Sequence, residues 1–461
     1  MKIRKVGLIC LTILLILTGC TGQSSEIAVS QHDYGREIAS YMDAYQEYYS
    51  YPYQGALLIA KEGQVLYEGA FGIADDQTDR MNTVDSVFPI GSVTKSFTGA
   101  AILKLQEQGL LHVQDPLSKY VDGHPRGDEI TIHQLLIHTS GLPREGLFWG
   151  INHVDLDDNL ESINRMSLLA EPGEDFAYSN AGYQYLAKVI EVASGKDYNR
   201  YIQEEILTPL GMNDSYMGVD ETYSENQSIG YEVTDGAPIR MYIYNFSAII
   251  GSGNIYSTVQ DMLKYTQALE GNDLLNESSM ESFEEGYVNL GGYEYGYGWD
   301  VEEKQGTICY SHGGCIGNGG YNSLVIRYPK EKISLILLTN NMDTTALFAV
   351  SESIESILFD RPYLMPVALE RIELDEGVLA EYEGTYQLEG EVEIPFTIKD
   401  GKLMSFADDG NEYEVIPIGQ DRFYYEGHEM VQVLFQWEEG EVIGVTFFNN
   451  TNRFEGKRIV E

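Results

Sequence analysis

Ser92 and Lys95 are the two residues of this chain whose types and spacing most directly allow nucleophilic chemistry. They lie three positions apart in FPIGSVTKSFTGAAILKL, at the expected start of a helix, so both side chains face the same side. A serine hydroxyl becomes nucleophilic when a base takes its proton. A lysine is such a base once burial or positive charge lowers its pKa, and a helix N-terminus adds partial positive charge and free N–H groups. The pair predicts a serine nucleophile whose own N–H helps to form an oxyanion hole, although a lone S-x-x-K is usually an exposed helix turn.

A second candidate element is Tyr178-Ser179-Asn180, within EPGEDFAYSNAGYQYLAKVIE. A tyrosine between a lysine and a leaving group can relay protons. An asparagine two residues further on offers hydrogen bonds to a substrate carbonyl and to the lysine. The alternative interpretation is that Ser179 or Asn180 simply caps the helix that follows.

A third candidate element is His312-Gly313-Gly314, which follows the strand-like QGTICYS. Two glycines allow the backbone to approach a ligand closely. The N–H of Cys315 would then complete the oxyanion hole opposite Ser92, and His312 could orient a carboxylate. By itself, His-Gly-Gly is usually just a turn.

The three elements, in this order, resemble the serine β-lactamase and penicillin-binding-protein superfamily. The chain is most similar to its group of class C β-lactamases, D,D-carboxypeptidases, D-aminopeptidases and family VIII esterases. Four further stretches fit that group, and the resemblance covers roughly residues 38–360. They are ITIHQLLIHTSGLP (130–143), EPGEDFAYSNAGYQYL (171–186), GSGNIYSTVQDMLKY (251–265) and YGYGWD (295–300).

The resemblance implies a role for each motif residue. Ser92 is the acylated nucleophile, Lys95 its base or proton relay, and Tyr178 assists acylation and activates the deacylating water. Asn180 binds the substrate amide, and the N–H groups of Ser92 and Cys315 form the oxyanion hole. No metal or other cofactor is implied, and His133 and His138 are five apart rather than at the i, i+4 spacing of a helical metal site.

The sequence departs from class C β-lactamases where those have Lys-Thr-Gly and this chain has His312-Gly313-Gly314. An imidazole is mostly neutral near pH 7, so the fixed positive charge that would bind a β-lactam carboxylate is lost. Histidine at this place is familiar among the family's peptidases and esterases. We therefore expect a serine hydrolase of small amides, peptides or esters, with D-amino-acid cell-wall peptides as the favoured substrates.

The hydrophobic pattern predicts an α+β fold in which both ends of the chain contribute strands to one antiparallel sheet covered by helices. Apolar residues at helical spacing run from Ile38 to Tyr49, and residues 55–72 read as a hairpin that turns at Gly63. A helix is expected over 92–109, ending at Gly109, followed by a mainly helical and loop-rich stretch to about 245. Further strands are expected within 295–340 and a last helix from Thr344 to Phe359.

Beyond residue 370 the chain alternates short apolar runs with turns, which predicts a small all-β barrel or sandwich at 370–461. It resembles the lipocalin-like modules appended to many members of the family. We expect the hydrolase domain to span 35–362. The β domain is expected to be a structural cap, with binding of cell-wall polymer or a lid function as alternatives.

The first residues indicate export. A basic start precedes an apolar run from Val6 to Leu17, which is too short to span a bilayer comfortably. It ends in Leu17-Thr18-Gly19-Cys20, which resembles the lipobox of bacterial lipoproteins. We expect a signal peptide at 1–19, a lipid on Cys20, and a polar tether at 20–34 that holds the protein on the outer face of a bacterial cell membrane. Of the remaining cysteines, Cys309 and Cys315 are expected to be free.

The charge balance excludes one class of partner. There are 72 acidic against 29 basic residues, a formal net charge of −43. Such a surface repels phosphate backbones, so nucleic acid is not an expected partner. Within enzymes, a carboxylesterase or a genuine β-lactamase is the alternative to a peptidase. A non-catalytic sensor of muropeptides or antibiotics, or a wall-binding lipoprotein, is the alternative of another class, and the intact Ser92, Lys95, Tyr178 and Asn180 argue against it.

Overall fold

The computed structural model describes residues 33–146, 153–218, 224–234, 237–241, 245–388, 392–406 and 410–459. The predicted signal peptide, Cys20 and nearly all of the tether lie outside these residues. The domain boundaries expected near 362 and 370 stay predictions. No helix within the described ranges is both long and apolar enough to cross a membrane.

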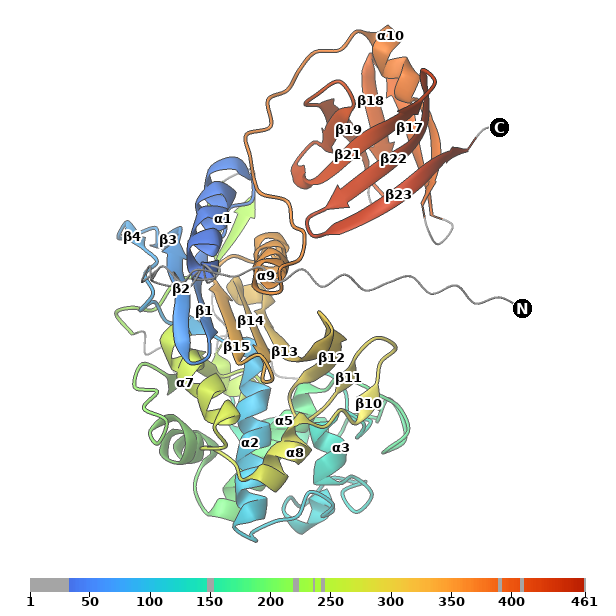
Figure 1. Cartoon of the computed structure of the whole chain (residues 1–461). Coiled ribbons are helices and arrows are strands. Elements are labelled where there is room, and N and C mark those ends of the chain that lie inside the picture. Colours follow the sequence, from blue (N-terminus) through green and yellow to red (C-terminus); the bar gives the residue numbers. More distant parts are fainter. Residues whose placement is uncertain are drawn as a thin grey trace, which may run out of the picture. The chain divides into compact units, whose positions relative to one another are not determined.

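A large antiparallel sheet is built from both ends of the hydrolase region, as predicted (Figure 1). Its strand order is β10-β11-β12-β13-β14-β15-β1-β2, and β1 pairs with β15 from Gly55 opposite Thr339 to Lys61 opposite Ile333. The strands are β1 (Gly55–Lys61), β2 (Gln64–Phe71), β10 (Val288–Asn289), β11 (Glu294–Tyr295), β12 (Asp300–Lys304), β13 (Thr307–Ile316), β14 (Tyr321–Tyr328) and β15 (Ile333–Thr339).

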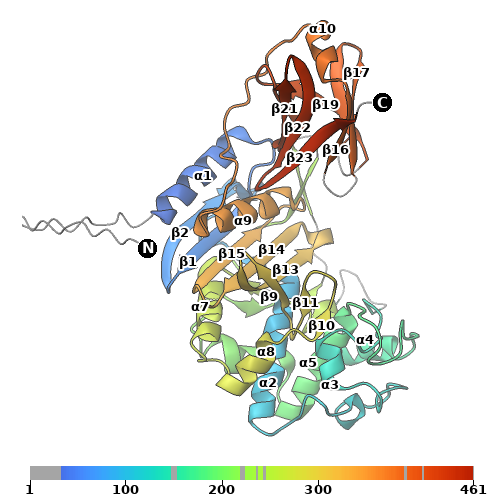
Figure 2. The ribbon, with the colours of Figure 1, turned by 45° about the vertical axis from the view of Figure 1, so that its right-hand side comes forward.

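The central strands are apolar on both faces because helices cover both faces. Along β1, Leu57 and Ile59 join the cluster packed against α1 (Tyr34–Tyr48) and α9 (Thr345–Leu358). The alternate residues Ala56, Leu58 and Ala60 join the larger core on the opposite face. That face is covered by α2 (Thr94–Glu107), α7 (Val259–Glu270) and α8 (Glu277–Glu284) (Figure 2). Burial of each large apolar side chain contributes about 1.5–3 kcal/mol.

The helix that carries the first motif begins differently from the prediction. The helix expected over 92–109 is a 3₁₀ turn, η1 (Gly91–Val93), followed by α2. Gly109 has φ +71°, so the expected glycine stop is present. Within α2, a Cβ on Gly99 would lie 2.5 Å from the carbonyl oxygen of Tyr297, which lies between β11 and β12. Glycine at this position therefore allows that segment to pack closely against α2.

The middle of the chain is mainly helical, but it also contains strands that the sequence reading did not predict. Its helices and short strands are η2 (Leu117–Lys119), α3 (Ile132–Leu136), α4 (Leu156–Ile163), α5 (Asn180–Ser194), α6 (Tyr198–Ile202), η3 (Gln203–Leu207), β6 (Tyr216–Met217), β7 (Tyr231–Thr234), β8 (Ala237–Arg240), η4 (Phe246–Ile249) and β9 (Ile255–Ser257). Three further short strands lie between β2 and η1: β3 (Ile73–Asp75), β4 (Arg80–Met81) and β5 (Phe88–Pro89).

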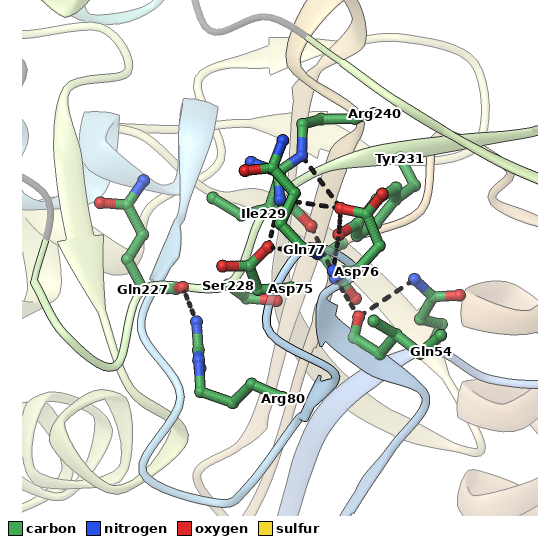
Figure 3. A network of polar contacts seen from close by, with 12 residues as sticks. Gln54, Asp75, Asp76, Gln77, Arg80, Gln227, Ser228, Ile229, Tyr231 and Arg240 are labelled. Carbon is green, nitrogen blue, oxygen red and sulfur yellow. Dashed lines mark hydrogen bonds and ion pairs between the residues drawn. The ribbon is translucent and has the colours of Figure 1, made fainter.

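A polar network attaches the unpredicted β7–β8 hairpin to β3 (Figure 3). The Arg240 guanidinium pairs with Asp75 and lies 2.7 Å from Oδ1 of Asp76. The Tyr231 hydroxyl donates to the same Asp76 oxygen over 2.9 Å. These contacts join residues about 155 positions or more apart, which explains why local sequence pattern did not reveal the hairpin.

The C-terminal region is a closed barrel of eight antiparallel strands, β16–β23, consistent with the predicted all-β fold. Closure pairs β16 with β23, for example Leu388 with Gly456. The sequence reading missed β23 because its residues, NRFEGKRI, show little apolar alternation. The elements are α10 (Glu376–Leu379), η6 (Ala380–Tyr382), β16 (Gly384–Leu388), β17 (Glu393–Lys399), β18 (Lys402–Phe406), β19 (Glu412–Pro417), β20 (Arg422–Tyr425), β21 (His428–Glu438), β22 (Glu441–Asn449) and β23 (Asn452–Ile459).

The barrel interior is filled by its own side chains rather than open. Its core is largely aromatic, and Phe435 lies 4.6 Å from Tyr382 and 5.1 Å from Phe396 between ring centroids. Aromatic contacts of this kind bury large areas and hold a small β domain together.

Candidate active site

Ser92 and Lys95 meet where η1 runs into α2. Nζ of Lys95 lies 3.0 Å from Oγ of Ser92 and 2.9 Å from the carbonyl oxygen of Ser252. The lysine side chain is fully buried. The two hydrogen bonds fix the amine at the serine hydroxyl, so it needs no rearrangement to exchange a proton with Oγ.

The environment of Lys95 favours the neutral amine. Burial lowers its pKa well below the ordinary value, the charge of Glu145 opposes this, and the positive charge of Arg144 adds to it. Nζ also lies 4.9 Å from the centroid of the Tyr178 ring and 5.5 Å from that of Tyr183. A lysine with a lowered pKa can accept a proton at neutral pH.

Tyr178 reaches the same serine from the turn before α5. Burial raises the pKa of its phenol, and a hydrogen bond with Ser92 is the main opposing effect. Ser179 caps α5, since its Oγ accepts the N–H of Gly182 over 2.9 Å. The capping role considered as an alternative is thus real for Ser179, and it fixes the turn that presents Tyr178 and Asn180.

Asn180 is paired with a carboxylate that the sequence analysis did not single out. Its Nδ2 donates to Oε1 of Glu145 over 2.6 Å, and its backbone N–H donates to the carbonyl oxygen of Arg144 over 2.7 Å. Burial raises the pKa of Glu145, while the hydrogen bond from Asn180 and the charges of Lys95 and Arg144 lower it. Glu145 lies two residues after the recognisable stretch 130–143, but a single glutamate carries no pattern that could have marked it.

His312-Gly313-Gly314 is not a turn, as the motif alone suggested, but part of the ten-residue strand β13. The strand lies close against η1: a Cβ on Gly314 would overlap the carbonyl oxygen of Ile90 and the hydroxyl of Ser323. A Cβ on Gly91 would lie 3.0 Å from the backbone nitrogen of Cys315. This close approach brings the Cys315 amide next to the turn that carries Ser92, the arrangement that a two-donor oxyanion hole requires.

A chain of hydrogen bonds runs behind the site from the Tyr178 turn to His312. The N–H of Ser179 donates to Nδ1 of His138 over 3.0 Å. The hydroxyl of Tyr295 lies 3.1 Å from Nε2 of His138 and 3.3 Å from Nε2 of His312. Nδ1 of His312 lies 2.7 Å from the carbonyl oxygen of Gly313.

His312 is neutral in this environment. Burial lowers the pKa of its imidazole to about 3, and the charge of Lys95 adds to that effect. The sequence predicts a mostly neutral His312 and leaves open that it orients a carboxylate. A neutral, buried ring whose two nitrogens are both engaged is a poor partner for a substrate carboxylate.

An open pocket of about 840 Å³ lies over these residues. Its apolar wall includes Phe246, Ile249 and Phe348. Seven of the eight sequence-predicted catalytic and oxyanion residues line the pocket and Lys95 lies against them, the seven being Ser92, Tyr178, Asn180, His312, Gly313, Gly314 and Cys315.

Asp300 is a further ionisable group on the pocket wall. It begins β12 and lies opposite Ser311 in the register with β13. Burial raises the pKa of its carboxyl group to about 7, and the charge of Glu302 adds to the shift. Asp300 is the last residue of the YGYGWD stretch (295–300). That stretch supports the family resemblance, but the sequence alone predicted no role for Asp300.

Of the two cysteines in this region, Cys309 is buried and Cys315 is exposed, and neither forms a disulfide. Within the described ranges, no group of three or more His, Cys, Asp or Glu residues has the arrangement of a metal site. His133 instead places Nδ1 2.7 Å from the hydroxyl of Tyr297.

Comparison with known proteins agrees with this geometry. Residues 39–353 match the family described as Beta-lactamase. Penicillin-binding protein 4* of Bacillus subtilis (strain 168) is 30% identical over 403 residues, 81% of this chain and 88% of that protein. The D-alanyl-D-alanine-carboxypeptidase/endopeptidase AmpH of Escherichia coli (strain K12) is 27% identical over 387 residues, 76% of this chain and 97% of that protein.

A solved structure with a similar fold covers nearly the whole chain. The octameric penicillin-binding protein homologue from Pyrococcus abyssi has a TM-score of 0.63 at 25% identity, covering 92% of this chain and 99% of that one. The likeness therefore extends beyond residues 39–353, into the C-terminal barrel.

Proposed function

Because the chain belongs to the beta-lactamase family of serine hydrolases, we propose that it cleaves amide bonds in small peptides through an acyl-Ser92 intermediate. The observation that carries the proposal is the position of the Lys95 amine at the hydroxyl of Ser92, with the Tyr178 ring beside it. A buried amine lies 3.0 Å from Oγ of Ser92, and the centroid of the Tyr178 ring lies 4.9 Å from that amine.

The reaction follows from these positions. Neutral Lys95 takes the Oγ proton as Ser92 attacks the carbonyl carbon of the substrate. The N–H groups of Ser92 and Cys315 stabilise the tetrahedral oxyanion. Collapse breaks the C–N bond, and the departing amine receives a proton through Tyr178 from Lys95. Water then attacks the ester with Tyr178 or Lys95 as base, which releases the acid and restores Ser92.

Peptides that contain D-amino acids from the cell wall are the substrates we favour. Support comes from the relative AmpH, whose name describes a D-alanyl-D-alanine carboxypeptidase and endopeptidase. The loss of the Lys-Thr-Gly lysine, and a His312 imidazole whose pKa burial lowers to about 3, argue against efficient β-lactamase activity. Ester hydrolysis uses the same groups and is the second candidate.

We also propose that the protein is anchored through Cys20 on the extracytoplasmic face of a bacterial membrane. The basic start, the short apolar run and the Leu17-Thr18-Gly19-Cys20 ending support this. The mass of the mature N-terminus tests it: lipid on Cys20 predicts a diacylglyceryl mass that Cys20→Ala abolishes. An N-terminus without that mass would contradict the anchor.

The catalytic proposal is tested by intact-protein mass spectrometry of the full chain with a fluorescent penicillin and with a chromogenic short-chain ester. Ser92→Ala is the control. An adduct on Ser92, or Ser92-dependent ester turnover, supports an acyl-enzyme hydrolase, and a long adduct lifetime separates a peptidase from a β-lactamase. A folded protein with neither adduct nor turnover would favour a non-catalytic sensor.

A further inference from the structure

Two buried acceptor atoms beside the nucleophile have no donor. Among the described residues, Oε2 of Glu145 and Oδ1 of Asn180 are buried side-chain atoms without a hydrogen-bond partner. The two side chains are held together through their other polar atoms, since Nδ2 of Asn180 donates to Oε1 of Glu145. A buried acceptor left without a donor is costly and calls for an explanation. Both residues line the pocket, and a ligand that brings a donor would satisfy them.

The charges around the pocket favour a cationic ligand over an anionic one. Glu145 and Asp300 both line it, and the charges of both raise the pKa of Tyr178. Arg144 is the one Lys or Arg among the described residues that line the pocket. Its side chain is 68% exposed and lies over the Tyr178 ring, with Nε 3.7 Å from Oε1 of Glu145. An exposed, already paired guanidinium offers little to a substrate carboxylate.

We propose that the pocket selects substrates that carry an ammonium group close to the scissile amide bond, with Glu145 and Asn180 as its acceptors. The inference rests on the proposed function, because it concerns substrates that Ser92 cleaves. An ammonium group has three N–H donors and no acceptor, which matches two unpartnered acceptors and a carboxylate charge. Hydrogen bonds between ionised partners are the strong ones in a partly buried site.

The position of the acceptors sets where the ammonium group lies on the substrate. Asn180 is two residues from Tyr178, whose ring centroid lies 4.9 Å from Nζ of Lys95, and that amine lies 3.0 Å from Oγ of Ser92. Asn180 and Ser92 also line the same pocket, so an ammonium at Asn180 lies near the carbonyl that Ser92 attacks. Two groups in peptides fit: the N-terminal α-ammonium of the residue that acylates Ser92, and the side-chain ammonium of a diamino acid just before it. In both cases Glu145 binds an ammonium group on the acyl part of the substrate rather than on the leaving group.

Matched probe pairs test the inference on the unaltered full-length protein. The first pair is D-alanine p-nitroanilide and its N-acetyl derivative. The second is Nα-acetyl-Lys-D-Ala-D-Ala and its Nα,Nε-diacetyl form. We expect kcat/KM to favour the free amine by about tenfold or more in at least one pair, as a charge-assisted hydrogen bond implies. The pair that responds identifies the α-ammonium or the side-chain ammonium as the group that is read.

The variant Glu145→Gln should reduce that preference by about tenfold, mainly through KM, because the amide keeps the shape and removes the charge. Because Glu145 also accepts a hydrogen bond from Asn180, the variant is judged by the ratio of kcat/KM between the two members of a pair and not by either rate alone. Glu204→Gln is the matched control, since Glu204 pairs with Lys196 and Arg200 on the surface and lies outside the pocket.

The outcomes separate the two proposals. Cleavage of both members of each pair at equal kcat/KM would overturn the inference and leave the proposed function in place, and it requires no variant to fold. A preference that persists in Glu145→Gln would also overturn the assignment to Glu145. Cleavage of none of the four probes would overturn the proposed peptidase function, and the inference with it.

Discussion

The hydroxyl of Tyr295 lies 3.3 Å from Nε2 of His312 and 3.1 Å from Nε2 of His138, so it links the two buried histidines behind the site. Ser179 N–H donates to Nδ1 of His138, so the His138 proton is on Nε2 and points to the Tyr295 oxygen. The Tyr295 proton is then free to point to Nε2 of His312, whose own proton on Nδ1 faces the Gly313 carbonyl. In this series of hydrogen bonds every donor therefore points the same way, from α5 to β13.

Replacing Tyr295 by Phe should therefore destabilise the fold and slow the reaction. The change leaves the facing nitrogens of two buried histidines without a partner, which costs about 1–3 kcal/mol. Because His138 also holds the turn before α5, we expect kcat to fall about tenfold with a small change in KM. Thermal unfolding and steady-state kinetics measure the two effects. Tyr293→Phe is the control, since that side chain is 40% exposed, and an equal loss there would contradict the proposed role of the chain.

Replacing Lys95 by Arg should abolish acylation while keeping a positive charge. A guanidinium cannot lose its proton in a protein, so it cannot accept the Oγ proton. We expect the rate of Ser92 adduct formation to fall by about a thousandfold or more. In the unaltered protein the lowered pKa of Lys95 places the acidic limb of the acylation rate well below pH 10, because the neutral amine is the active form. Acylation by the Arg variant at a comparable rate would exclude Lys95 as the base.

Asp300 should make the stability of the protein fall as pH rises. Its pKa is about 7 in the folded protein, against about 3.9 in an unfolded chain. Between these values the folded state binds more protons than the unfolded state, so the free energy of unfolding decreases from about pH 4 to pH 7. Asp300→Asn removes this effect and should exceed the unaltered protein in stability by about 4 kcal/mol at pH 8, with little difference near pH 4. Denaturant titrations at the two pH values measure it, and a pH-independent difference would contradict the assignment.

The sequence revealed the residues that occur in patterns and missed those that act singly. Ser92, Lys95, Tyr178 and His312 stand in short motifs at characteristic positions, and the order of early and late strand-like runs predicted the sheet that β1 and β15 share. The pairing of Glu145 with Asn180 bridges 35 positions and depends on the tertiary fold alone. Nothing in the local sequence could report it.

The backbone around the third motif shows a second limit of sequence reading. His-Gly-Gly suggested a turn because glycine is common in turns. The glycine at 314 is instead required where β13 crosses η1, since any Cβ there would overlap Ile90 and Ser323. In a sequence, a glycine that forms a turn cannot be told from a glycine that allows two elements to pack closely. Only the position of the neighbouring element distinguishes the two roles.

This contrast predicts opposite outcomes for two adjacent substitutions. Gly314→Ala should force β13 away from η1, lowering stability by about 1–3 kcal/mol and displacing the Cys315 N–H from the oxyanion position. Gly313→Ala should leave stability nearly unchanged, because its Cβ would come no closer than 3.8 Å to a neighbour, the Ser323 carbonyl oxygen. Thermal unfolding of the two variants checks the stabilities, and adduct formation on Ser92 checks the oxyanion hole. Equal stabilities would show that β13 and η1 are not so closely packed.

Removal of the C-terminal barrel should leave the chemistry intact on a small substrate. Every described residue that lines the pocket falls between Ser92 and Phe348, so no described barrel residue takes part in its wall. A chain ending at residue 365 should hydrolyse a soluble p-nitroanilide or ester with a kcat within about threefold of that of the full chain. The kcat of each protein is calculated from the concentration of Ser92 that a fluorescent penicillin labels.

Counting per labelled Ser92 separates lost folding from lost chemistry. A truncated protein that unfolds reacts at fewer serines, but each folded molecule still turns over at the expected rate. A fall of kcat by tenfold or more in molecules whose Ser92 still reacts would contradict the prediction. It would mean that the barrel acts on the site as a lid or as part of it, rather than as a structural cap.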